Sequence, residues 1–409
     1  FVPLWSLLIK KLSSMTFASI VWDVDQVLVH LGSLEIRFLI TACGGEKEAT
    51  TKKTDEAATI KIGGLGPLTG PLAIYGVTAT NGSKLAFEEI NKNGGILGKQ
   101  VEFVLFDEKG DSTEAVTAYN RLVDEGVVAL VGDITSKPSL AVAEIAAQDN
   151  MPMITPTGTQ FNITEAGPNV FRVCFTDPYQ GVILANLAKN NLKANTVAIM
   201  VNNSSDYSDG VAEAFIKEAE RLGLKIVAKE GYAEGDKDFR AQLTKVAATN
   251  PDVLLVPDYY EQVALITTQA REVGVKSTFI GPDGWDGVAK ALDSSAYGAV
   301  ENSYFTNHYS VEDTNEKVQN FLKAYREKYK DEPSAFSALS YDAAYLMKDA
   351  IEKAGSTDKD AIVKAMKESD FAGVTGHLRF DEKNNPFKAV TVLKVVNGNY
   401  TFDSVIQPE

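Results

Sequence analysis

The stretches VALVGD, residues 128–133, and VLLVPD, residues 253–258, are short apolar runs that each end in an aspartate. Each run precedes a polar loop and then a segment with apolar residues at helical spacing. Parallel strands that are covered on both faces have this composition, and crossover helices connect them. Two such units in separate halves of the chain predict an α/β protein with two doubly wound, Rossmann-like lobes.

From Thr59 onward the whole chain repeats this alternation of β-branched runs and amphipathic segments. Strands are predicted at 60–62, 101–106, 127–131, 153–154, 197–201, 225–227, 253–256 and 279–280. Helices are predicted at 74–93, 112–125, 138–149, 208–223, 238–249, 259–273, 314–330, 335–354 and 358–368, followed by a strand-rich tail. A chain of 409 residues exceeds what one hydrophobic core usually supports, which also favours two lobes.

The composition disfavours several classes of function. The chain has 40 Lys and Arg against 55 Asp and Glu, and this net charge of −15 argues against nucleic acid or an anionic membrane as partner. With just two cysteines, Cys43 and Cys174, no disulfide framework or cysteine-rich metal site is predicted. The histidines, His30, His308 and His377, lack metal-ligand spacing. A small-molecule protein without a metal or cofactor fits best.

Residues 1–58 differ from the rest of the chain. Ile40-Thr41-Ala42-Cys43 is similar to a bacterial lipoprotein box, with Cys43 as the lipidated residue, and residues 44–58 are interpreted as a flexible tether. Charged residues interrupt the apolar core expected of a signal peptide, so we interpret residues 1 to about 37 as not the natural leader. A chance cysteine in a disordered leader is the alternative. No run reaches the roughly 18 apolar residues of a membrane span.

The loops after the predicted strands carry hydroxyls, amides and one acid. Ser136 and the run Thr155–Thr159 suit a small carboxylate, although helix capping and turn chemistry explain each residue alone. In GPDGWDG, residues 281–287, Asp283 sits in a strong turn tripeptide, and both a turn and a ligand anchor are open for it. A carboxylate-binding loop in one lobe and an acid in the other would together hold a zwitterion.

Enzyme hypotheses find little support in the sequence. Gly64-x-Gly66-x-x-Thr69 has threonine where a dinucleotide fingerprint needs its third glycine, and no Walker motif or Gly-x-Ser-x-Gly elbow is present. We therefore expect a protein that is not an enzyme; a dehydrogenase is the enzymatic alternative, which absence of nicotinamide binding would remove.

Four motifs, together with residues 373–381, occur in the order typical of one family. They are GPLTGPLAIYG (66–76), MITPTGT (153–159), GDKDF (235–239) and GPDG (281–284). On these motifs the chain, from about Thr59 to its end, resembles the branched-chain amino-acid-type substrate-binding proteins of ABC transporters, the Leu/Ile/Val-binding family. The resemblance implies the type I periplasmic-binding fold, whose chain crosses between lobes three times.

The three crossings are then expected near Asp177, Thr306 and Phe387. This division gives lobe 1 as residues 59–177 and 307–387, and lobe 2 as residues 178–306 and 388–409.

The resemblance also implies an amino-acid site. Ser136 matches the position that binds the ligand carboxylate, beside the Thr159 amide. The Thr157 carbonyl and the Thr159 hydroxyl would meet the ammonium group. Asp283 stands where the family places the acidic ammonium partner, usually a glutamate, which is one methylene longer.

Aromatic residues complete the expected site. Tyr75, Tyr207 and Tyr259 match wall positions of the family. Trp285 is added on proximity to Asp283 alone, and core packing and pocket contact are both open for it. The cysteine pair of some relatives is missing, with Thr135 at one of its positions.

The implied function is capture of a neutral, aliphatic L-amino acid, with leucine, isoleucine and valine favoured because the matched positions supply no further charged side chain. The ligand would close a clamshell, and the closed monomer would present it to an ABC permease. The protein would be extracytoplasmic, lipid-anchored to the bacterial cell membrane through Cys43 or otherwise periplasmic. A ligand-sensing domain that does not serve transport, and a binder of a small amide, are the alternatives.

Overall fold

The computed structural model describes residues 59–407. Cys43, the leader and the tether lie outside these residues, so the predictions made for them stay predictions. No helix between residues 59 and 407 combines the length and the apolar character that a membrane span requires.

The first lobe is built on a five-stranded sheet with the order β2-β1-β3-β4-β5, in which all neighbours are parallel. Its strands are β1 (Ile60–Gly66), β2 (Val101–Asp107), β3 (Ala129–Val131), β4 (Met153–Thr155) and β5 (Val170–Arg172). A purely parallel sheet needs crossover connections, and helices follow its strands as the sequence pattern predicts.

The second lobe is built on a seven-stranded sheet with the order β14-β13-β10-β9-β8-β6-β7. Its strands are β6 (Thr196–Asn202), β7 (Lys225–Tyr232), β8 (Val253–Leu255), β9 (Thr278–Gly281), β10 (Tyr304–Asn307), β13 (Val390–Val396) and β14 (Asn399–Ile406). Near one edge β13 pairs antiparallel with both β10 and β14, and the other neighbours are parallel. A separate hairpin pairs β11 (Asp370–Gly373) with β12 (Gly376–Arg379).

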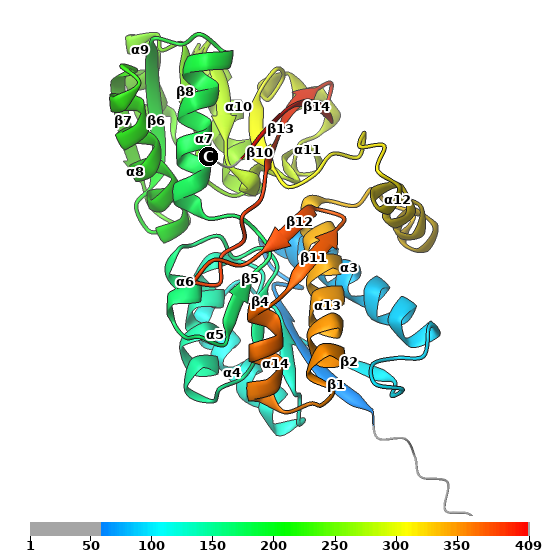
Figure 1. Cartoon of the computed structure of the whole chain (residues 1–409). Helices are drawn as coiled ribbons and strands as arrows, with labels where there is room; N and C mark the ends of the chain where they lie inside the picture. Colours follow the sequence, from blue (N-terminus) through cyan, green and yellow to red (C-terminus); the bar gives the residue numbers. More distant parts are fainter. Residues whose placement is uncertain (1–58, 408–409) are drawn as a thin grey trace, which may run out of the picture. The chain divides into compact units, whose positions relative to one another are not determined.

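Helices cover both faces of each sheet (Figure 1). They are α3 (Ala73–Lys92), α4 (Ser112–Asp124), α5 (Ser136–Gln148), α6 (Asn162–Glu165), α7 (Asp177–Asn186), α8 (Asp206–Arg221), α9 (Arg240–Thr249), α10 (Tyr260–Glu272), α11 (Val288–Ala291), α12 (Glu316–Tyr329), α13 (Ala335–Ala354) and α14 (Lys359–Lys367). α13 lies along α3 in the first lobe, and α7 lies along α8 in the second.

The two stretches with which the sequence analysis began each divide their side chains between two cores. In β3, Ala129 and Val131 pack into the cluster under α3 and α13, whereas Leu130 packs into the cluster under α4 and α5. In β8, Val253 and Leu255 face one core, and Leu254 faces the other. Alternate residues of a strand point to opposite faces, so both faces of each sheet are buried and every residue of the run must be apolar.

Most predicted elements appear within a few residues of their expected bounds. The sequence pattern did not predict β5, β10 or α7, because the two strands are only three and four residues long and α7 opens on Asp177-Pro178 without a clear apolar stripe. The α/β class with two lobes is confirmed. The crossings near Asp177, Thr306 and Phe387 stay predictions, supported by β10 ending at Asn307 and by the return of β13 to the second sheet.

Candidate functional site

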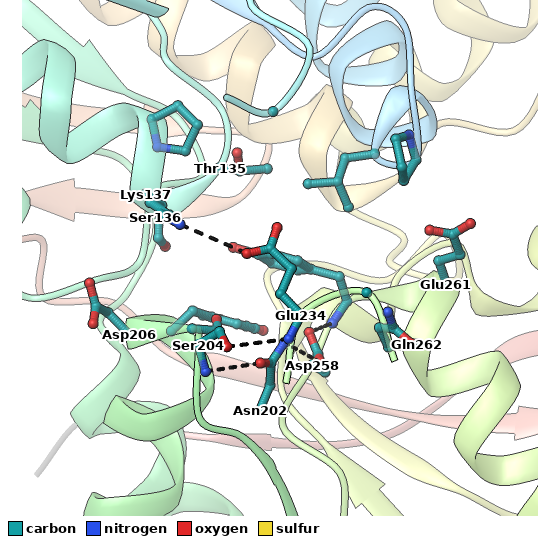
Figure 2. Close-up of a pocket in the computed structure, with 18 of the residues that line it drawn as sticks. Thr135, Ser136, Lys137, Asn202, Ser204, Asp206, Glu234, Asp258, Glu261 and Gln262 are labelled. Carbon is teal, nitrogen blue, oxygen red and sulfur yellow. Dashed lines mark hydrogen bonds and ion pairs between the residues drawn. The ribbon is translucent and has the colours of Figure 1, made fainter. Parts of the chain in front are cut away.

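A cavity of about 390 Å³ lies between the two lobes, at the carboxyl ends of their strands. The N-terminal ends of α5, α8 and α10 border it, which is where doubly wound folds bind ligands. Figure 2 shows Thr135, Ser136 and Lys137 on one side of the cavity and Asn202, Ser204 and Asp258 facing them.

Three of the predicted site residues, Ser136, Tyr207 and Tyr259, line this cavity, and five others do not. The five are Tyr75, Thr157, Thr159, Asp283 and Trp285. The contacts of these five residues show which of them touch a residue of the cavity wall.

The first lobe supplies hydroxyls and free amides. The Ser136 Oγ lies 3.5 Å from the Thr159 Oγ1 and accepts a hydrogen bond of 3.3 Å from the Gln160 amide. The Thr157 hydroxyl donates to the Ile134 carbonyl at 2.5 Å and so fixes the loop, and the Thr157 carbonyl accepts no backbone hydrogen bond within residues 59–407. Within residues 59–407 the Thr159 N–H donates to no protein acceptor although Thr159 is buried. A buried amide of this kind suits a ligand oxygen.

The second lobe supplies Asp283, which is 2% exposed at the start of a tight turn after β9. Its Oδ1 accepts hydrogen bonds from Gln180 Nε2 at 3.0 Å and from the Tyr207 hydroxyl at 2.9 Å. Its Oδ2 lies 3.2 Å from His308 Nε2. The carboxylate therefore sits directly behind Tyr207, one residue away from the cavity wall.

The glycines beside Asp283 are required by close packing. A Cβ on Gly281 would lie 1.7 Å from the Trp285 Nε1, and one on Gly284 would lie 2.7 Å from the Tyr207 hydroxyl and 3.0 Å from the Asp258 carbonyl. The chain is bare on both sides of the acid because aromatic side chains press against the turn.

Three tyrosines connect the two sides. Tyr207 and Tyr259 stack with ring centroids 4.8 Å apart, and Tyr75 meets Tyr259 edge-on at 5.6 Å. The Tyr75 hydroxyl donates to the Gly284 carbonyl and accepts from the Tyr260 amide at 3.1 Å, so this residue of the first lobe bonds to the second. Burial raises the pKa of Tyr75, Tyr207 and Tyr259 well above the usual value, which keeps all three hydroxyls neutral.

Trp285 lies in the core of the second lobe. It is fully buried, packs among apolar side chains of that core, and donates from its indole Nε1 to the Val256 carbonyl at 2.8 Å. Since the only polar atom of its side chain is already bonded and the residue does not line the cavity, the geometry supports core packing over the predicted pocket contact.

Sequence reasoning missed the side chains that surround Asp283. Gln180 comes from α7, and His308 follows β10, stacked on Phe175 with centroids 3.8 Å apart. Burial lowers the pKa of His308 to about 4, despite its bond to Asp283, so the ring is neutral at pH 7. The His308 Nδ1 has no partner within residues 59–407, which is consistent with the tautomer that carries the proton on Nε2 and donates it to Asp283. Nothing in the sequence links residues 180, 283 and 308.

A second buried acid stands next to this cluster. Asp177 is 1% exposed, and its Oδ2 has no hydrogen-bond partner within residues 59–407. Burial raises the pKa of Asp177 well above its usual range, and the nearby Asp283 carboxylate adds to the rise.

The cavity lining also contains charged residues that the family positions did not indicate. They are Lys109, Asp111, Lys137, Asp206, Glu234, Lys237, Asp258 and Glu261. Several already have partners: Lys137 pairs with Glu234 across the cavity at 3.8 Å, as Figure 2 shows, and Asp258 accepts from the Tyr232 hydroxyl at 2.6 Å. These paired charges have less to offer a charged ligand than unpaired ones would.

Three buried polar atoms in the same lining have no partner within the described chain. They are the Thr135 Oγ1, the Gln160 Oε1 and the Gln262 Oε1. The orientation of the Gln160 amide is fixed, because its Nε2 donates to Asp206 across the cavity at 3.4 Å. No group of three or more His, Cys, Asp or Glu side chains in residues 59–407 is placed to hold a metal ion.

Comparison with known proteins agrees with this architecture. A family model described as "Periplasmic binding protein" matches residues 59–399. The chain belongs to this family. The resemblance that the sequence motifs indicated is thereby confirmed.

The relatives carry names of one ligand class. The chain is 35% identical over 315 residues, 76% of its length and 84% of the relative's, to the Leu/Ile/Val-binding protein BraC3 of Rhizobium johnstonii. It is 31% identical over 330 residues, 80% of its length and 87% of the relative's, to the leucine-, isoleucine-, valine-, threonine- and alanine-binding protein of Pseudomonas aeruginosa.

A solved structure gives the same fold. The branched-chain amino acid transporter substrate-binding protein LivJ of Streptococcus pneumoniae, in complex with isoleucine, superposes with a TM-score of 0.79 at 34% identity. The match covers 86% of this chain and 100% of that one. The type I periplasmic-binding fold is confirmed at this level of likeness.

Proposed function

We propose that this protein is the extracytoplasmic solute-binding component of an ABC importer and that it captures an uncharged, aliphatic L-amino acid. The observation that carries the proposal is the pairing of two unlike loops. The free Thr159 amide and the Ser136 hydroxyl stand in one lobe, and the Asp283 carboxylate stands in the other behind Tyr207. A zwitterion needs donors at one end and an acid at the other, because both of its charges are desolvated on binding.

The ammonium group would enter the donor shell of Asp283. In this structure the Tyr207 hydroxyl donates to Oδ1, so an incoming ammonium would join or replace it as a donor. Separation of the lobes would break the bond between the Tyr75 hydroxyl and Gly284, and closure around the ligand would restore it. The ligand thus supplies contacts that only the closed form completes.

The names of the relatives support leucine, isoleucine and valine as the first ligands to test. Delivery to a membrane permease is the role that the family context supports, with lipid anchoring through Cys43 as the sequence predicts. Binding without transport is distinguished by whether the protein stimulates a reconstituted permease and its ATPase.

The test is calorimetry and a melting-temperature panel with the aliphatic amino acids against glutamate and lysine. A ligand at a hundred times its Kd should stabilise the folded protein by about 2.7 kcal/mol, a shift of a few degrees. Shifts from glutamate or lysine without any from leucine, isoleucine or valine would contradict the ligand assignment.

A further inference from the structure

Arg172 is a fully buried cation that contacts only neutral groups. Its Nη1 donates to the Gly158 carbonyl at 2.9 Å, and its Nη2 donates to the carbonyls of Gln160 at 2.8 Å and Phe161 at 2.9 Å. The Thr164 hydroxyl lies 3.3 Å from the same Nη2. Within residues 59–407 the guanidinium forms no ion pair with a carboxylate. A buried charge that forms no ion pair is costly, which suggests a role beyond packing.

These acceptors all belong to one segment, residues 158–164, and that segment contains the predicted carboxylate-binding amide. The Gly158–Thr159 peptide bond is trans, so its carbonyl and its N–H point in opposite directions. Because the Gly158 carbonyl points at Arg172, the Thr159 N–H points away from it. This N–H is the one that donates to no protein acceptor.

From this geometry we infer that Arg172 is a positioning residue for the ligand carboxylate and acts through the Gly158–Thr159 peptide. The guanidinium holds the peptide plane so that the Thr159 N–H points toward the ligand side. Its charge also polarises the amide, since hydrogen bonds in a chain strengthen one another in a low-dielectric interior. A bound carboxylate would then add a counter-charge that is separated from the guanidinium by a single peptide unit.

The second lobe offers a matched control. Arg271, at the end of α10, donates from its Nη1 to the carbonyls of Val275 at 2.8 Å and Ser277 at 3.0 Å. It repeats the contact of a guanidinium with loop carbonyls, but neither Arg271 nor its acceptors line the cavity. Replacing it should lower stability without a change in ligand binding.

The inference rests on the proposed function. Comparing two ligands, leucine and leucinamide, distinguishes failure of the inference from failure of the proposed function. Leucine has the carboxylate, and leucinamide keeps the ammonium group and the side chain but has a neutral amide in its place. For Arg172→Gln, which retains two donors and loses the charge, calorimetry should show about a tenfold or larger loss of leucine affinity. Leucinamide affinity should stay within about threefold, and Arg271→Gln should change neither affinity.

A purely structural Arg172 would lower the affinity for both ligands together, and unchanged leucine affinity in a folded variant would equally overturn the inference. If Arg172→Gln does not fold, Arg172→Lys tests the same difference between the two ligands, with leucine again the one that weakens. On the unmutated protein, the Thr159 amide should shift in NMR spectra with leucine and far less with leucinamide; equal shifts would overturn the inference. A wild-type protein that binds no uncharged amino acid overturns the proposed function as well.

Discussion

The two sides of the site use charge in opposite ways. On the first lobe the buried charge beside the predicted carboxylate-binding loop, Arg172, donates to the Gly158 carbonyl, and neutral groups, the Thr159 amide and the Ser136 hydroxyl, are the proposed donors to the ligand. On the second lobe the charged group proposed to meet the ligand, Asp283, lies behind Tyr207, and neutral donors surround it. Binding of the ligand carboxylate at the first lobe should therefore depend on several small contributions. Binding of the ligand ammonium group at the second lobe should depend on one large contribution.

The largest expected effect comes from removing the acid. Asp283→Asn should weaken binding of leucine by about 2–5 kcal/mol, because the ligand ammonium would lose its proposed acidic partner in a desolvated site. Calorimetry measures this loss. Asp342→Asn is the control, since Asp342 is another buried aspartate, bonded to the amides of Val374 and Thr375 away from the cavity. Affinity of the Asp283 variant within a factor of about three of wild type would break the comparison.

The next largest effect is on the pH dependence of the free energy of unfolding. His308 has a pKa of about 4 in the folded protein because of burial, below its ordinary value of 6.5. The unfolded chain therefore binds the proton more readily, so this residue contributes stability above pH 6.5 that is lost as the pH falls toward 4, by roughly 3 kcal/mol in all.

Urea unfolding between pH 7 and pH 4 measures this loss, and His308→Gln, which keeps a donor for Asp283, should remove that part of the pH dependence. Equal slopes for wild type and variant would show that His308 is not held neutral behind the acid.

A smaller effect is expected on the donor side. Ser136→Ala should weaken leucine binding by about 1–1.5 kcal/mol, roughly tenfold, because the Thr159 amide still holds the carboxylate. Ser139→Ala is the control on the same helix, since its buried hydroxyl has no hydrogen-bond partner among residues 59–407 and Ser139 does not line the cavity. A loss for Ser136→Ala as large as that for Asp283→Asn would mean that the two sides do not differ.

The smallest effect is expected at the rim. Lys137 and Glu234 face each other across the cavity at 3.8 Å, with side chains 64% and 73% exposed. Exposed pairs of this kind contribute little, so Lys137→Ala should change the leucine Kd by less than about twofold. Leucine titrations at low and high salt provide the check. A large, salt-dependent loss of affinity would show that a charged side chain of the first lobe contributes to binding.

The alternation of apolar runs and helical segments determined the fold class. In VALVGD and VLLVPD every residue of the run is apolar because both faces of each sheet are covered, and that requirement is visible in the chain. The same local pattern was too short to reveal β5, β10 and α7, which are held in place by neighbours that are distant in the sequence.

The sequence by itself also indicated the residues proposed to contact a ligand, because Ser136, Thr159 and Asp283 follow strand ends in motifs with turn chemistry. Only the tertiary structure decided what stands behind them. Arg172, Gln180 and His308 are ordinary residues in the sequence, and they acquire their roles because folding removes water and leaves their charges and donors with one set of partners. The same burial placed Trp285 in the core, because solvent exclusion and close contact depend on the assembled lobes and not on proximity along the chain.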